Sequence, residues 1–227
     1  MTFTDKISKQ IEGLFKIQCF DINDNLIDEY EDKNLVLNTA RNAVAAVIGG
    51  TSTTIVDSFY LGTKGHRYVD DGLGGFTEDV FQPHDSVDTD PLKPIGNQTF
   101  TVDKTSMFSN STVGGIDGAI TYKFPFDPTL ASNNVFGEKI VTDATVVPAV
   151  LNTTSTDTVA TTISRTLTDN NLTFVINIPT GAGNDTNPIP FTEAALYSGS
   201  NIFSMKTYQT RVKTNTVKFV ITWTITF

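Results

Sequence analysis

The C-terminal segment 216–227 alternates between large apolar and polar side chains with the period of a β-strand. Its apolar positions are Val217, Phe219, Ile221, Trp223, Ile225 and Phe227. Successive side chains of a strand point to opposite faces, so all six are predicted to share one face. The intervening residues are mostly Thr, which suits a lightly packed face of an antiparallel sheet. The pattern predicts a long strand that contributes one buried face to the core.

Weaker versions of the same pattern recur along the chain. Strands are predicted at 14–22, 25–31, 55–61, 98–103, 118–126, 138–147, 171–178, 191–197 and 201–208. The first two flank Asn23, Asp24 and Asn25, whose side chains tolerate left-handed backbone, so they are predicted to form a β-hairpin. We expect a mostly β protein, an antiparallel β-sandwich that forms a single domain over residues 1–227.

Two short segments have the period of a helix instead. Residues 39–48 place Ala40, Ala43, Val44, Val47 and Ile48 on one face. Asn38 or Thr39 can cap the start, and Gly49-Gly50 can end the helix. A shorter N-terminal helix is predicted from Ile7, Ile11 and Leu14, with Thr4 as its cap. The helix at 39–48 is expected to pack on the sandwich.

Residues 63–98 lack either period and are rich in Gly and Pro, which predicts an irregular acidic loop. Its acids are Asp70, Asp71, Glu78, Asp79, Asp85, Asp88 and Asp90, and no Lys or Arg lies between residues 70 and 90. Asp85, Asp88 and Asp90 have the oxygen ligands that suit Ca²⁺, although the spacing of an EF-hand is absent. A carboxylate pair for sugar hydrolysis is a further alternative, but it requires a rigid scaffold. A solvated, self-repelling loop is the preferred interpretation.

The composition limits the kinds of partner. The net charge is −9 and only 18% of residues are charged. Nucleic-acid binding requires a basic surface that neutralises phosphates, and no basic run is present. We therefore expect no direct contact with nucleic acid. No stretch has the ~18 apolar residues of a membrane span, so we expect no membrane association.

Residues that could carry catalysis are few. His66 and His84 both lie in the acidic loop, and Asp85 and Ser86 follow His84 directly, but neighbours in sequence do not make a triad. Cys19 is the only cysteine, which excludes an intrachain disulfide and a Cys-based metal cluster. It alternates with Phe15 and Ile17, so we expect it to be buried and inert. The sequence predicts no enzyme activity, no catalytic or cofactor-binding residues, no metal site and no small-molecule ligand.

Two regions resemble structural proteins of tailed-bacteriophage particles. In residues 16–50 a hairpin leads to Asn34-Leu35-Val36 and then to a short helix that ends in Gly49-Gly50, and Tyr60-Leu61-Gly62-Thr63 follows. The segments Phe191-Thr192-Glu193-Ala194-Ala195-Leu196-Tyr197, Ile202-Phe203-Ser204-Met205-Lys206 and 217–227 resemble the closing strands of neck, baseplate and fibre-attachment proteins. The resemblance implies a non-catalytic virion subunit, made in the host cytoplasm, that binds copies of itself and other virion proteins in a symmetric ring or trimer.

The segments expected to meet neighbouring subunits are 1–12, 63–98 and the edges of the closing strands. Glu193 could bridge to a neighbouring subunit, accept backbone N–H bonds, or pair within the chain with Arg41 or Lys206. A carbohydrate-binding, adhesin-like module on a host-recognition fibre is the alternative function. In that case Tyr68, Phe76 and Phe81 would lie beside the loop acids and contact sugar.

Overall fold

The computed structural model describes residues 11–36, 38–51, 55–63, 66–70, 76–82, 93–94, 120–143, 150–185, 187–199 and 201–227. The N-terminal half contains β1 (Glu12–Phe20), β2 (Leu26–Val36), α1 (Asn38–Ile48), β3 (Ser58–Gly62), β4 (His66–Asp70), β5 (Phe76–Gln82) and β6 (Lys93–Pro94). The remainder contains β7 (Ile120–Pro125), β8 (Ser132–Val135), β9 (Glu138–Asp143), β10 (Val150–Thr156), β11 (Thr161–Thr168), β12 (Asn171–Ile178), β13 (Ile189–Ser198), β14 (Asn201–Lys213) and β15 (Lys218–Thr226).

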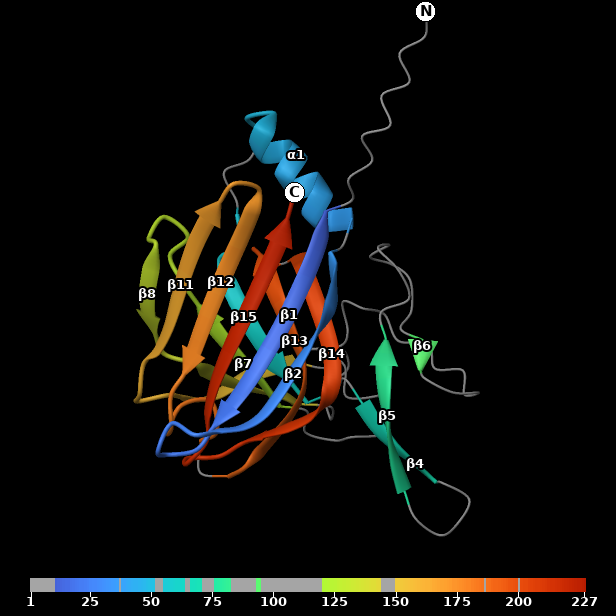
Figure 1. Ribbon diagram of the computed structural model, residues 1–227, viewed down its shortest axis with the longest axis vertical. Coiled ribbons are helices and arrows are strands. Elements are labelled where there is room, and N and C mark those ends of the chain that lie inside the picture. Colours follow the sequence, from blue (N-terminus) through green and yellow to red (C-terminus); the bar gives the residue numbers. More distant parts are fainter. Residues whose placement is uncertain are drawn as a thin grey trace, which may run out of the picture.

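Two antiparallel sheets pack face to face as a sandwich (Figure 1). One sheet has the order β2-β1-β15-β12-β11-β8, and the other has the order β10-β9-β7-β3-β13-β14. The strand β2 joins them, because its last residues, Leu35 and Val36, pair with Met205 and Ser204 of β14. Strands β4, β5 and β6 form a separate small sheet.

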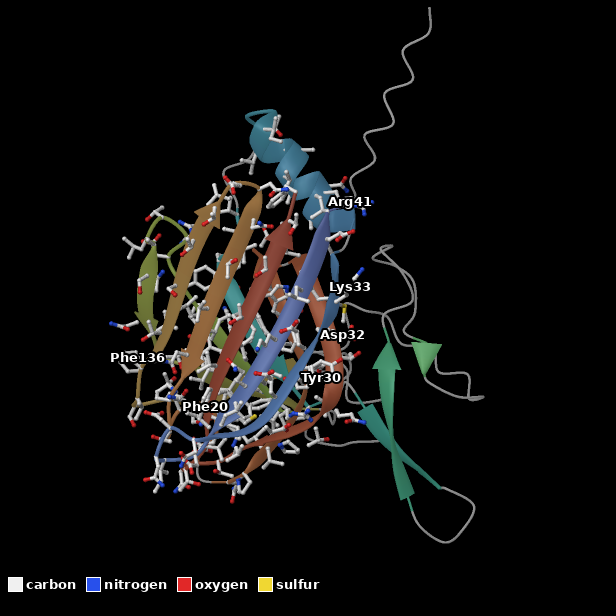
Figure 2. All side chains as sticks on the ribbon, in the orientation of Figure 1. Phe20, Tyr30, Asp32, Lys33, Arg41 and Phe136 are labelled. Carbon is white, nitrogen blue, oxygen red and sulfur yellow. The ribbon has the colours of Figure 1, made fainter. Side chains whose placement is uncertain are left out.

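Beyond this short pairing, β2 and β14 are joined by side chains. Lys206 Nζ lies 2.6 Å from Asp32 Oδ2, and Arg211 Nε lies 2.6 Å from Asp28 Oδ2. Tyr30 and Asp32 lie on β2 on the side that borders β14 (Figure 2). Each acid is about half exposed, so each pair contributes little to stability on its own. Together the two ion pairs link β2 of one sheet to β14 of the other along the side of the sandwich where these strands no longer pair through their backbones.

The core follows from the alternation along the strands. Four apolar side chains of β15 are fully buried in the core between the two sheets: Phe219, Ile221, Trp223 and Ile225. The Trp223 ring lies edge-on to Phe15 on the neighbouring strand and to Phe59 on the facing sheet. The β15 strand is central, since β1 and β12 pair with its two edges. Phe227, the last residue of the alternating pattern, is an exception, because it lies at the surface.

Most of the predicted elements are confirmed. The hairpin at 14–31 corresponds to β1 and β2, the predicted helix at 39–48 is α1, and the strand at 171–178 is β12. The turn between β1 and β2 places Asp24 at a φ of 62°, the left-handed conformation that its side chain favours. Strands β8, β10 and β11 were not predicted, because β8 is short and polar and the Thr-rich sequences of β10 and β11 carry little hydrophobic periodicity.

Two predictions need correction. The N-terminal helix was expected to include Leu14, but Leu14 belongs to β1 and pairs with Thr224. Pairing with β15 overrides the helical spacing there, and the rest of that predicted helix, residues 1–10, lies outside the described residues. The segment 63–98, predicted to be irregular, contains β4, β5 and β6. Their aromatic and β-branched residues favour strands, and the many Gly, Pro and Asp residues between them obscured this signal. The predicted strand at 98–103 also lies outside the described residues.

Candidate protein interaction surfaces

A groove of about 380 Å³ lies at the end of the sandwich that carries α1. We call it the α1 groove, and its lining is almost entirely apolar. It is lined by Ala43, Val44, Val47 and Ile48 of α1, Ile55, Val56, Arg165, Leu167, Leu172, Phe174, Ser198, Phe203 and Phe227. The volume falls within the ~300–1,000 Å³ of typical ligand pockets. The groove can therefore accept a cluster of apolar side chains.

The end of α1 explains why the rim of the groove is exposed. Gly50 adopts a φ of 68°, and its N–H donates to the Val47 carbonyl oxygen at 3.1 Å. Such a left-handed residue stops a helix abruptly. Ile48 is consequently left at the helix end with 82% of its surface exposed. Across the groove Leu167 of β11 is 68% exposed, and Val47, Ile55 and Phe227 are each more than one-third exposed.

Arg165 is the only charged residue among those that line the α1 groove. It lies on β11 and pairs in register with Phe174 of β12, on the floor of the groove. Within the described residues its guanidinium has no carboxylate at salt-bridge distance, although it interacts electrostatically with the Asp127 carboxylate of the same chain. The groove therefore offers an apolar surface with a single positive charge.

A second apolar surface lies at the opposite end of the sandwich. It consists of residues 21–27, which are the turn between β1 and β2 and the first two residues of β2. Ile22, Leu26 and Ile27 are all more than half exposed there. We call it the hairpin tip. The strand β1 starts at Glu12, which pairs with Thr226 next to the α1 groove, and its nine residues span about 30 Å before the tip begins. Figure 1 shows α1 and this turn at opposite ends of the sheet.

The hairpin tip is held rigid by its own hydrogen bonds. Oδ1 of Asp21 accepts the backbone N–H groups of Asn23 at 2.8 Å and Asn25 at 2.9 Å, and Oδ2 accepts the Asn25 side-chain amide at 3.0 Å. The bonds from Asn25 are the main reason that the pKa of Asp21 is lowered, so this carboxylate is ionised at neutral pH. The tip therefore presents three aliphatic side chains together with the polar residues of the turn, among them the carboxylates of Asp21 and Asp24.

A buried polar cluster fastens the loop 179–185. The side chain of Lys213 is fully buried, and its Nζ donates to the carbonyl oxygens of Pro179 at 3.0 Å and Thr214 at 3.1 Å. Burial lowers the pKa of Lys213 to about 8. Asp157 accepts the Gly183 N–H at 2.9 Å, and burial raises its pKa to about 6. Because Lys213 has no access to solvent, the cluster is suited to holding the loop and not to acting on a ligand.

The side chains of the predicted histidine and acid residues lie outside what the structure describes. His66 and Asp70 lie on β4, Glu78 and Asp79 lie on β5, and the placement of their side chains is not described. His84, Asp85, Ser86, Asp88 and Asp90 lie outside the described residues. Among the side chains that are described, no three His, Cys, Asp or Glu residues lie close enough together to hold a metal ion.

Glu193 is not available to a neighbouring subunit. Its side chain is 1% exposed and lies against Gly62 on the adjacent strand β3. The predicted partner Lys206 pairs with Asp32 instead. The bridge to a neighbouring subunit is therefore wrong, because β13 is buried on both faces, whereas the alternatives within the chain agree with the burial of this carboxylate.

The residues of the two apolar surfaces were not predicted as sites. A signal existed for each of them. Ile48 directly precedes Gly49-Gly50, so the last residue of the helix, a position that is usually exposed to solvent, is large and apolar. Leu26 and Ile27 are consecutive, and in a strand two neighbours cannot both face the core.

Comparison with models of protein families, with curated proteins and with solved structures finds no match for this chain. Within the described residues, no helix has the length and hydrophobicity needed to span a membrane.

Proposed function

We propose that this chain is a non-catalytic structural subunit that assembles by protein–protein contacts, in the neck, tail or baseplate of a tailed bacteriophage. Its partners are copies of itself and other virion proteins, and its location is the virion. The single observation that carries the assembly role is the exposed apolar α1 groove.

Exposed apolar surface of this kind is unusual on a protein that acts alone. Monomeric proteins scatter exposed hydrophobic residues singly, and contiguous apolar patches generally mark an interaction site. In the α1 groove five large side chains that are more than one-third exposed surround a concave apolar floor. Burial of such side chains contributes roughly 25 cal/mol per Å² of apolar area, which favours association with another protein surface.

The bacteriophage part of the proposal has a separate basis. It is supported by the resemblance of residues 16–50, 55–63 and 191–227 to virion proteins. The hairpin, the helix that ends in Gly49-Gly50 and the closing strands on which it rests are all present as elements of the fold. The negative charge of the chain supports solubility before assembly.

Purified particles of a phage that encodes this chain provide the test. We expect quantitative mass spectrometry to find the chain at a fixed stoichiometry to the major structural proteins after density-gradient purification. Cryo-electron microscopy of the same particles should show the α1 groove covered by a neighbouring protein. Absence of the chain from the particles would refute the virion assignment, and an uncovered groove would refute its role in assembly.

The carbohydrate-binding alternative has no support in the described geometry. Its candidate residues Tyr68, Phe76 and Phe81 lie on β4 and β5, and the placement of their side chains is not described. Specific binding of the purified chain to a glycan array would favour that alternative over the structural role.

A further inference from the structure

The two apolar surfaces of the chain differ in shape. The α1 groove is concave and is bordered by Val47, Ile48, Ile55, Leu167 and Phe227. The hairpin tip projects and carries Ile22 on the turn and Leu26 and Ile27 at the start of β2. They lie at opposite ends of β1, so one copy of the chain cannot bring its own tip to its own groove. Two copies can.

The position of the two surfaces at opposite ends of the sandwich favours head-to-tail association over a symmetric dimer. A symmetric dimer that paired groove with groove would leave both hairpin tips exposed. Insertion of a tip into the groove of the next copy buries both surfaces and leaves one of each free at the ends. This is a heterologous contact, which produces a closed ring or an open filament.

The charges of the two surfaces are complementary. Arg165 brings one positive charge to the groove, and Asp21 brings one negative charge to the tip. The other acids near the tip have cationic partners within the chain, because Asp24 pairs with Lys218 and Asp28 pairs with Arg211. Within the described residues Asp21 forms no such ion pair, and Arg165 has none at salt-bridge distance, although it interacts electrostatically with Asp127. Complementary charges of this kind fix the orientation of a contact more than they strengthen it.

We infer that the α1 groove binds the hairpin tip of a second copy of this chain, so that copies associate head to tail. This inference rests on the proposed function, and it identifies the partner at the same surface. Ile22, Leu26 and Ile27 of one copy would be buried against the apolar lining of the next, with Asp21 near Arg165.

The test uses full-length chains in which one surface is altered at a time. The tip variant carries Ile22→Lys and Ile27→Lys, and the groove variant carries Ile48→Lys and Leu167→Lys. All four positions are exposed, so both variants should keep the fold and the melting temperature of the wild type. The matched control carries Phe136→Lys and Val159→Lys, two exposed apolar positions that neither line the groove nor belong to the tip.

Sedimentation velocity would measure association across a range of concentrations. We expect the wild type and the control to form oligomers, and each altered variant to associate more than about tenfold more weakly, because a charge enters an apolar contact. The decisive sample is an equimolar mixture of the tip and groove variants. Each supplies the surface that the other lacks, so the mixture should form a 1:1 dimer that grows no further.

Three outcomes would overturn the inference: a monomeric wild type, full association of either folded variant, or a mixture that forms no 1:1 dimer. They are distinguishable from failure of the proposed function. If the chain is present in particles with its groove covered by a different protein, the head-to-tail contact is refuted and the structural role stands. If the chain is absent from particles, the virion assignment fails whatever its association in solution.

Discussion

Phe15 on β1 and Trp223 on β15 are direct partners across two central strands, and their rings meet edge to face with centroids 5.0 Å apart. The same indole lies 6.3 Å from the Phe59 ring of the opposite sheet. Edge-to-face contacts add roughly 0.5–1.5 kcal/mol to the stabilisation that comes from burial. Trp223 therefore joins both sheets at the centre of the sandwich.

Replacing Trp223 by Ala should reduce the free energy of unfolding by about 3–5 kcal/mol, because it leaves a cavity between two sheets that cannot collapse fully. Guanidinium denaturation followed by circular dichroism would measure this. Thr222→Ala on the other face of β15 is the control and should change stability by less than about 1 kcal/mol. Equal effects at the two positions would mean that the strand is not buried on one face alone.

Gly62 and Glu193 are paired across β3 and β13. The side chain of Glu193 occupies the space that a side chain at residue 62 would need. A Cβ at residue 62 would lie 2.9 Å from Cγ and Cδ of Glu193. Because Glu193 is buried, it cannot swing aside into solvent. We expect Gly62→Ala to cost about 1–3 kcal/mol of stability.

A double-mutant cycle tests the cause of this cost. If the clash with Glu193 is responsible, Gly62→Ala should be less harmful when residue 193 is already Ala, and the difference gives the coupling energy. Additive effects in the cycle would show that the cost arises elsewhere, for example in the backbone of β3.

The free energy of unfolding should change with pH in the alkaline range because of Lys213. Its pKa is about 8 in the folded protein and 10.5 in the unfolded chain. Between these values the unfolded chain holds a proton that the folded protein has released, so the free energy of unfolding contributed by this residue rises with pH. We expect the stability difference between the wild type and Lys213→Met to shift in favour of the wild type by up to about 3 kcal/mol from pH 8 to pH 10.5.

This difference is measured by denaturation of both proteins at each pH. Both proteins carry Cys19→Ala, because Cys19 and Lys213 shift each other's pKa. The comparison then cancels the titration of the buried tyrosines, which occurs in both proteins. A difference that stays constant across the interval would mean that Lys213 keeps its proton when buried.

Cys19 should be unreactive in the native protein. Its side chain is 4% exposed, and burial raises the pKa of its thiol to about 11. Only the thiolate reacts with disulfide reagents, so both access and ionisation oppose the reaction. We expect no labelling by an aromatic disulfide reagent at pH 8 over the time in which the denatured chain reacts completely. Rapid reaction of the native protein would show that β1 opens locally.

Periodicity along the chain determined much of the fold. In β12 and β15 the apolar residues recur at every second position, so the strand, its buried face and its place in the core can be read directly from the sequence. The helix α1 was equally clear, because its apolar face lies between a capping residue and Gly49-Gly50. These signals are local, since each depends on residues within a few positions of one another.

The tertiary structure decided which polar residues are buried and which apolar residues remain exposed. Lys213 is buried because its amine meets the carbonyl oxygen of Pro179, 34 residues away, and Glu193 is buried because β13 is covered on both faces. The polar strand β8 forms because β11 supplies its hydrogen-bond partners. The α1 groove brings together residues as distant as Ala43 and Phe227. Such surroundings are made by strands far apart in sequence, and no local pattern of residues contains them.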